Sequence, residues 1–177
     1  MTTGPKIVSG VKFKKYRTAL QENFDYPLDF AYGEEPITFA DTSTEVCIKY
    51  SSAQTVHFVY SPSQKTYYRF QFNGVPHVDG LTGEQLKFEN LLIVFCKTGA
   101  ITGDAKNRIE VGTVGKGTGY YVTNGTYTSI TWEKTSHESP IRYFDAEGNP
   151  LEMNPGKTFV SVCPTTVEQT IRFNPVK

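Results

Sequence analysis

Two side chains in the sequence, His77 and Asp79, have the types and spacing of a general base and a carboxylate that orients it. An imidazole titrates near neutral pH, and a neighbouring carboxylate can fix its tautomer or share a metal ion with it. Both roles need further partners that the sequence does not identify. The structural alternative is that Asp79 caps the turn at 80–82 and that His77 is a polar residue satisfied beside Tyr68.

The face on which this pair lies depends on the hairpin turn before it. The dipeptide Asn73-Gly74 is typical of a two-residue turn, because both positions require positive φ. Such a turn pairs residue 72 with 75, 70 with 77 and 68 with 79. This register predicts that His77 and Asp79 share a face with Tyr68, whereas Arg69 points to the other face.

A second Asn-Gly turn, at Asn124-Gly125, predicts a longer hairpin. Its register places Trp132 opposite Gly117 and Ile130 opposite Gly119, so the tryptophan lies over a stripe of glycines. A phosphate-binding glycine loop would need a helix after the glycines, but the residues that follow predict a strand. A third interpretation stays open, in which a flat ligand such as a sugar stacks against Trp132.

No other catalytic or metal-ligating motif is visible. His57 and His137 have no motif around them, and the carboxylates are scattered singly. Cys47, Cys96 and Cys163 lie far apart in apolar, strand-like runs, without the spacing of a metal or redox site. We therefore predict buried free thiols, with one incidental disulfide as the alternative, and expect neither a metal nor a cofactor.

The elements that position these side chains are mostly strands. Short runs with β-strand character are separated by turn residues, at a spacing typical of an antiparallel sheet. The predicted strands are 45–50, 54–60, 66–72, 75–79, 89–96, 107–111, 117–123, 126–134, 141–145, 150–153 and 157–163, with 167–173 as a further candidate. A helix is predicted at 12–24, an extended edge segment at 24–32 and a short helical turn at 82–85. The fold class is therefore mainly β, an antiparallel sandwich or a partly open barrel with one N-terminal helix.

Length and charge limit the classes of function. The chain has 177 residues, enough for one β-rich domain, which we place at 12–177 after a flexible end at 1–11. Its 18 basic and 18 acidic residues cancel, which argues against a general binder of nucleic acids or anionic membranes. The apolar run at 91–96 is too short to span a bilayer and no signal peptide is visible, so the chain itself is expected to be soluble.

A series of short motifs carries a family resemblance. In order they are Tyr67-Tyr-Arg69, Asn73-Gly-Val-Pro-His-Val-Asp79, Thr82-Gly-Glu-Gln-Leu86, Asn90-Leu-Leu-Ile-Val94, Gly115-Lys-Gly-Thr-Gly119, Asn124-Gly125, Ile130-Thr-Trp-Glu-Lys134, Asp145-Ala-Glu-Gly148 and Pro155-Gly-Lys-Thr-Phe-Val160. The series resembles the C-terminal domain of the YerB-like family of predicted bacterial lipoproteins, a domain of unknown function, over about residues 37–164. The resemblance implies an N-terminal domain and a lipid anchor outside this chain, and a location at the outer face of the cytoplasmic membrane. It implies no established activity.

The sequence thus supports three hypotheses about function. The leading one is a non-catalytic β-rich module of a cell-envelope lipoprotein that binds an unknown glycan, peptide or protein partner. Its candidate ligand-binding residues are Tyr68, Arg69, His77, Asp79 and Trp132. The first alternative is an envelope hydrolase that uses His77 and Asp79. The second is a structural domain that packs on an N-terminal domain absent from this chain.

Overall fold

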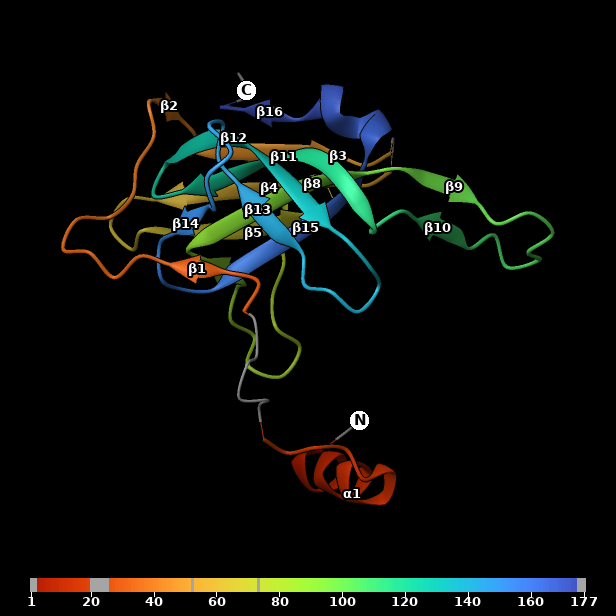
Figure 1. The fold of residues 1–177 in the computed structure, drawn as a ribbon. Coiled ribbons are helices and arrows are strands. Elements are labelled where there is room, and N and C mark those ends of the chain that lie inside the picture. Colours follow the sequence, from red (N-terminus) through yellow and green to blue (C-terminus); the bar gives the residue numbers. More distant parts are fainter. Residues whose placement is uncertain (1–2, 20–25, 52, 73, 175–177) are drawn as a thin grey trace.

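Two six-stranded sheets packed face to face form most of the protein (Figure 1). The computed structural model describes residues 3–19, 26–51, 53–72 and 74–174. The first sheet has the order β13 (Arg142–Phe144), β12 (Thr126–Lys134), β11 (Gly115–Thr123), β8 (Asn90–Cys96) and β15 (Thr158–Pro164), with β2 (Asp41–Thr42) beside β12. The second sheet has the order β16 (Arg172–Phe173), β3 (Glu45–Lys49), β4 (Thr55–Ser61), β5 (Thr66–Gln71) and β6 (Val75–Pro76), with β7 (Lys87–Phe88) beside β5.

Two small sheets and a 3₁₀ helix flank the sandwich. β1 (Asp29–Phe30) pairs in parallel with β14 (Glu152–Met153). β9 (Thr98–Ala100) and β10 (Ile109–Val111) pair in antiparallel fashion and project to one side of the sandwich (Figure 1). The 3₁₀ helix η1 (Thr165–Thr170) connects β15 to β16 and so joins the two large sheets.

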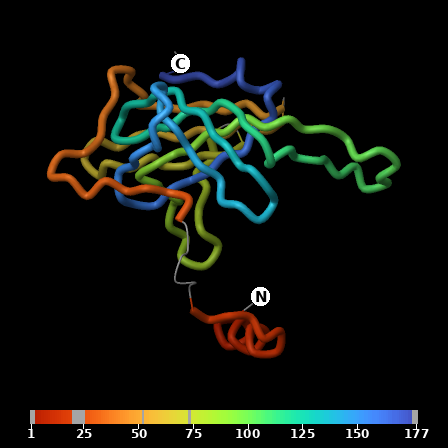
Figure 2. Tube along the Cα trace, in the orientation of Figure 1, coloured from red at the N-terminus to blue at the C-terminus, as the bar shows by residue number. Residues whose placement is uncertain are grey.

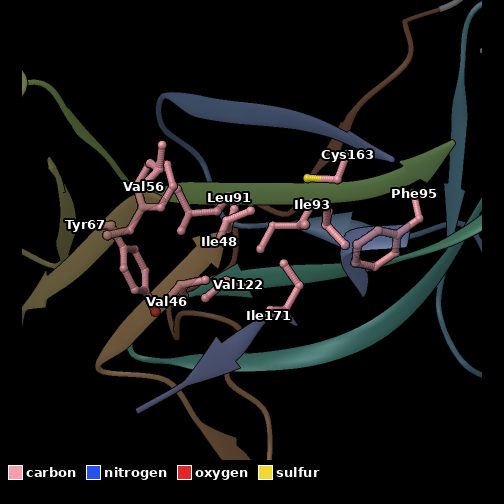
Figure 3. Close-up of a cluster of buried hydrophobic side chains, with 12 residues drawn as sticks. Val46, Ile48, Val56, Tyr67, Leu91, Ile93, Phe95, Val122, Cys163 and Ile171 are labelled. Carbon is pink, nitrogen blue, oxygen red and sulfur yellow. The ribbon is translucent and has the colours of Figure 1, made fainter. Parts of the chain in front are cut away.

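A buried core fills the space between the two sheets, and Figure 3 shows the side chains that compose it. The strand β8 is buried on both of its faces. Leu91, Ile93 and Phe95 face this core, whereas Leu92, Val94 and Cys96 face a second core on the other side of the first sheet. The second core also contains Tyr121, Ile130, Trp132, Tyr143, Leu151 and Met153. Burial on both faces explains why the run at 91–96 is apolar without alternation.

The fold class predicted from the sequence is confirmed, because the structure is mainly β and sandwich-like with an N-terminal helix. One pairing departs from an antiparallel sheet, since β15 runs parallel to β8, with Thr158 opposite Asn90 and Pro164 opposite Cys96. Two parallel neighbouring strands cannot be joined by a tight hairpin turn and need a longer connection. The regular spacing of turn residues therefore gave no sign of this pairing.

The N-terminal helix lies earlier in the chain than predicted. α1 spans Gly4–Lys14 and not 12–24, of which residues 20–24 lie outside the described residues. Pro5 suits the first helical turn, and Lys15 ends the helix in the left-handed conformation, with φ of 53°. The Tyr16 N–H donates to the carbonyl of Val11 at 3.0 Å, which completes a Schellman motif.

The spacing of aromatic residues predicted the wrong bounds for this helix, because these aromatic side chains do not pack against a core. Phe13 and Tyr16 are 82% and 65% exposed, and α1 buries none of its residues. Figure 2 shows α1 apart from the sandwich. No helix among the described residues is long and apolar enough to cross a membrane.

Two other predicted segments form less regular structure than expected. Within the segment 24–32, whose first two residues lie outside the described part, only Asp29–Phe30 pairs with another strand. The helical turn expected at 82–85 is absent from the structure, and the short helix is η1 instead. This helix occupies most of the candidate strand at 167–173, of which only β16 is extended and paired.

Candidate functional site

The predicted register of the hairpin that carries His77 is wrong by one residue. Gln71 pairs with Val75 and Phe70 with Pro76, so three residues and not two separate the paired positions. Phe72 takes part in the loop with a φ of 47°, and Asn73 lies outside the described residues. A shift of one residue moves every side chain of the second strand to the opposite face.

The shift gives His77 a different neighbour. Its N–H donates to the carbonyl of Arg69 at 3.0 Å, so Arg69 and not Phe70 is the residue opposite. Tyr68 lies on the other face of β5, where its hydroxyl donates to Gln64 Oε1 at 2.7 Å. The structure therefore separates His77 from Tyr68 and brings it beside Arg69.

Asp79 caps a turn, as the structural alternative predicted. Its Oδ1 accepts the N–H groups of Leu81 at 2.9 Å and Thr82 at 2.8 Å. These two amides lower the pKa of the Asp79 carboxyl, so the cap is ionised at neutral pH and weakens only under acidic conditions. No described contact joins Asp79 to His77, whose Nδ1 is buried without a hydrogen-bond partner in the described part of the chain.

Arg69 is partly buried on the inner side of β5. Its guanidinium carbon lies 5.2 Å from the ring centroid of Phe159, and burial lowers the pKa of the side chain. Within the described residues, Arg69 Nε has no hydrogen-bond partner. Arg69 and His77 are thus neighbours with unsatisfied nitrogen atoms, but no described cavity opens onto them.

Trp132 belongs to the second core. The hairpin at Asn124-Gly125 has the predicted register, with Trp132 opposite Gly117 and Ile130 opposite Gly119. Trp132 is 2% exposed, and its Nε1 donates to the carbonyl of Phe95 at 3.2 Å. Its indole covers Gly117 so closely that nothing can enter between the two residues.

A polar cavity lies at one end of the sandwich, where connections from distant parts of the chain meet. Its volume is about 310 Å³, within the range of small-ligand sites. We call it the loop-end pocket. It is lined by Ala31, Gly33, Glu34, Glu35, Pro36, Gln64, Lys65, Glu89, Thr123, Asn124, Asn154 and Pro155.

Buried polar side chains behind the loop-end pocket hold its connections together. Asn90 Oδ1 accepts the hydroxyls of Tyr121 at 2.8 Å and Thr123 at 2.9 Å, and Asn90 Nδ2 donates to the Asn154 carbonyl at 2.7 Å. Asn154 in turn bonds both the N–H and the carbonyl of Ile37, at 2.8 and 2.9 Å. This network ties the segment around Ile37 to β8, β11 and the connection after β14, so the pocket is preformed.

The charge around the loop-end pocket is mainly negative. Glu34 and Glu35 are exposed at its rim, and Glu89 accepts the N–H of Lys157 at 2.6 Å. Lys65 is the one basic side chain among the lining residues that the structure describes. The lining contains carboxylates, amides and a hydroxyl but no histidine or cysteine, a set that suits binding of N–H and O–H groups better than nucleophilic catalysis.

A second cavity, of about 580 Å³, is lined by Asp29, Ile37, Phe39, Asp145, Asn149, Pro150, Leu151 and Glu152. It offers less for polar recognition, because Phe39 and Leu151 in its lining belong to the second core. Its Asp145 already accepts the N–H groups of Glu147 and Asn149. The loop-end pocket is therefore the better candidate for ligand binding.

The structure also brings together a cluster that the sequence analysis missed. On the outer face of the second sheet, Cys47 Sγ lies 3.9 Å from His57 Nε2, and His57 Nδ1 lies 3.0 Å from Glu45 Oε1. All three cysteines are free thiols; Cys96 and Cys163 are buried as predicted, but Cys47 is only partly buried. Alternation along the predicted strands 45–50 and 54–60 was the signal that could have placed these side chains on one face.

Comparison with known proteins gives a family and a fold. The model of the protein of unknown function (DUF3048) C-terminal domain matches residues 46–160. No curated protein matches the sequence. The crystal structure of the YerB protein from Bacillus subtilis superposes with a TM-score of 0.78 at 21% identity, over 98% of this chain and 55% of the YerB chain. The fold is therefore that of a YerB-like C-terminal domain, and the chain belongs to the DUF3048 C-terminal domain family, whose function is unknown.

Proposed function

We propose that this domain is a non-catalytic binding module and that the loop-end pocket takes a polar group of a glycan or peptide. The observation that carries the proposal is a preformed polar cavity of about 310 Å³ whose walls are connecting loops on a rigid sandwich. Loops held by a rigid scaffold are the usual place for recognition. The polar network behind the pocket lowers the entropy cost of ordering these loops on binding.

The charge at the rim narrows the class of ligand. Glu34 and Glu35 are exposed and can each accept hydrogen bonds from a protonated amine. Lys65 contributes a single positive charge against these two carboxylates. Charge-assisted hydrogen bonds of this kind are about twice as strong as neutral ones. The best match is thus an amino sugar or a peptide segment with a free amino group.

We place this binding module in a cell-envelope lipoprotein. The support is the resemblance to the YerB-like family, which implies export and a lipid anchor on a part of the protein outside this chain. The chain spans 55% of the length of the YerB chain it matches. A partner in the envelope, and not nucleic acid, is consistent with the zero net charge.

The double substitution E34Q/E35Q tests the loop-end pocket. We expect it to weaken binding of an amino-sugar disaccharide or a short lysine-containing peptide about tenfold, because two charge-assisted hydrogen bonds become neutral. The measurement is an NMR titration in which amide shifts map the site. Shifts in the wild type should concentrate at 33–36 and 123–124.

The matched control is E138Q, an exposed glutamate outside the pocket lining, which should leave the affinity unchanged. The N-acetylated disaccharide, which lacks the free amine, should bind the wild type and E34Q/E35Q equally. Equal affinity of the two proteins for the free amine, or shifts confined to another face, would contradict the proposal.

The hydrolase alternative gains no support from the geometry. It needs Asp79 to orient His77, but Asp79 Oδ1 already accepts two backbone amides. The neighbour that His77 does have, Arg69, is a cation and cannot act as a nucleophile or a base at neutral pH.

A second candidate function, packing on another domain of the parent protein, is favoured by one exposed hairpin. The segment 72–86 projects from the sandwich (Figure 1). Its apolar side chains are unusually exposed, with values of 61% for Phe72, 53% for Val75, 47% for Val78 and 85% for Leu81. Several large apolar side chains exposed on one projecting segment commonly mark an interface.

Hydrogen exchange tests this second candidate. In a form of the protein extended on its N-terminal side, we expect the amides of 74–83 to exchange at least about tenfold more slowly than in this chain, because packing would exclude local opening. The projecting hairpin of β9 and β10 is the internal control and should exchange equally in both forms. Equal exchange of 74–83 in the two forms would mean that the hairpin makes no such interface.

A further inference from the structure

We propose that Cys47 is a reactive thiol that exchanges with small disulfides, with His57 as its base and Glu45 as the positioning residue of that base. The product is a mixed disulfide on the outer face of the second sheet. This role is independent of the loop-end pocket. Neither cysteine chemistry nor this face enters the binding function proposed above.

The strand pairing places the three side chains together. Val46 and Ile48 are fully buried toward the core, so Glu45 and Cys47 point to the opposite, outer face of β3. Cys47 lies directly opposite His57 of β4. The sheet therefore fixes the positions of thiol and imidazole without any loop.

The hydrogen bonds give His57 the tautomer that a base needs. With Nδ1–H donating to Glu45 Oε1 at 3.0 Å, the lone pair of Nε2 points to Cys47 Sγ at 3.9 Å. The order of thiol, imidazole and carboxylate is that of an activated nucleophile, a base and the group that orients the base. The Sγ–Nε2 distance is long, but such contacts commonly shorten when a reactant binds.

Among the described residues, four charged or titratable groups face the thiol: Glu45 and Lys49 on β3, His57 on β4 and Arg172 on β16. Burial and the Glu45 carboxylate raise the pKa of Cys47, while Arg172 and Lys49 act in the opposite direction. The thiol is therefore protonated at neutral pH. It needs a base to become nucleophilic, and His57 is in position to serve.

The step balances with a disulfide as the co-reactant. The Cys47 thiol proton moves to His57 Nε2 while Sγ attacks one sulfur of the small disulfide. The new bond joins Sγ to that sulfur, the old sulfur–sulfur bond breaks, and the departing thiolate takes the proton from His57. One disulfide is consumed and one is formed, so no further oxidant is required.

The mixed disulfide has no internal thiol to release it. Cys96 and Cys163 are 3% and 0% exposed and lie in the two cores. Cys47 is on the outer face of the second sheet, so the sheet stands between it and both cores. The adduct should therefore persist until an external thiol removes it.

Reaction of the native protein with Ellman's reagent, an aromatic disulfide, tests this assignment. We expect one fast-reacting thiol per chain, which the substitution C47S removes. The substitution H57Q should slow the fast reaction at least about tenfold at about pH 7, less than the roughly 10²–10⁴-fold that a positioned base typically contributes. H137Q, at an exposed histidine away from the cluster, is the matched control and should react as the wild type does.

The pH dependence of the wild-type rate provides a second readout that needs no variant. With His57 as base, the reaction does not require a free thiolate, so the rate rises much less than tenfold per pH unit above neutral pH. A thiol with a raised pKa and no base would instead react about tenfold faster for each pH unit up to about pH 9. A rise of that size throughout, or a wild-type rate in folded H57Q, would overturn the proposal.

Discussion

Replacing Asn90 with alanine is expected to lower the free energy of unfolding by about 4 kcal/mol. Asn90 is fully buried, and its side chain makes three hydrogen bonds of 2.7 to 2.9 Å, to Asn154, Tyr121 and Thr123. Alanine would remove all three bonds at once. The Tyr121 and Thr123 hydroxyls would still accept hydrogen bonds from Asn154 but would lose Asn90 as their acceptor. Loss of one partner of a buried hydrogen bond costs about 1–3 kcal/mol, so the sum over three bonds exceeds the effect of most single substitutions.

Urea unfolding followed by circular dichroism measures this loss. The control is N149A, because Asn149 is an exposed asparagine whose side-chain hydrogen bond in the described part of the chain stays within its own turn, at 3.2 Å to Asp145. We expect N149A to change stability by less than about 1 kcal/mol. A loss below about 1 kcal/mol for N90A as well would show that the network does not hold the loop-end pocket in place.

The secondary structure was largely predictable because it depends on short-range patterns. Asn124-Gly125 fixed a hairpin whose register the structure reproduces, with Gly117 opposite Trp132. The same dipeptide at 73–74 predicted the wrong register for its hairpin. Phe72 adopts positive φ there and lengthens the loop by one residue. Positive φ is unusual for an aromatic residue, so local propensity could not reveal it.

The candidate site was much less predictable, because long-range packing creates it. The loop-end pocket joins residues around 31–36, 64–65, 89, 123–124 and 154–155. These connections meet only through the strand order of the sandwich, including the parallel pairing of β8 and β15. Single positions in them carry no pattern that distinguishes a pocket wall from an ordinary loop. The Cys47 cluster was more predictable than the pocket and less predictable than the strands, since it forms within one hairpin.

Replacing Gly117 with alanine is expected to destabilise the protein by about 3 kcal/mol, although only one methyl group is added. A Cβ at this position would lie 2.5 Å from Trp132 Nε1 and 2.7 Å from the Phe95 carbonyl oxygen. The indole would have to leave its place, which breaks its hydrogen bond to Phe95, and the main chain of β8 would have to shift as well. Overpacking and the lost hydrogen bond both lower the stability of the folded protein.

Trp132 reports this change directly, because it is the single tryptophan of the sequence. Its fluorescence in G117A should shift to the red as the indole becomes exposed, together with the lower stability. The control is G99A in β9, where a Cβ meets nothing within 4 Å, and we expect a change of less than about 0.5 kcal/mol. If G117A kept the wild-type emission and stability, the indole could not lie against the glycine stripe. Trp132 would then be free to take part in recognition after all, which makes this substitution a test of the site as well as of the core.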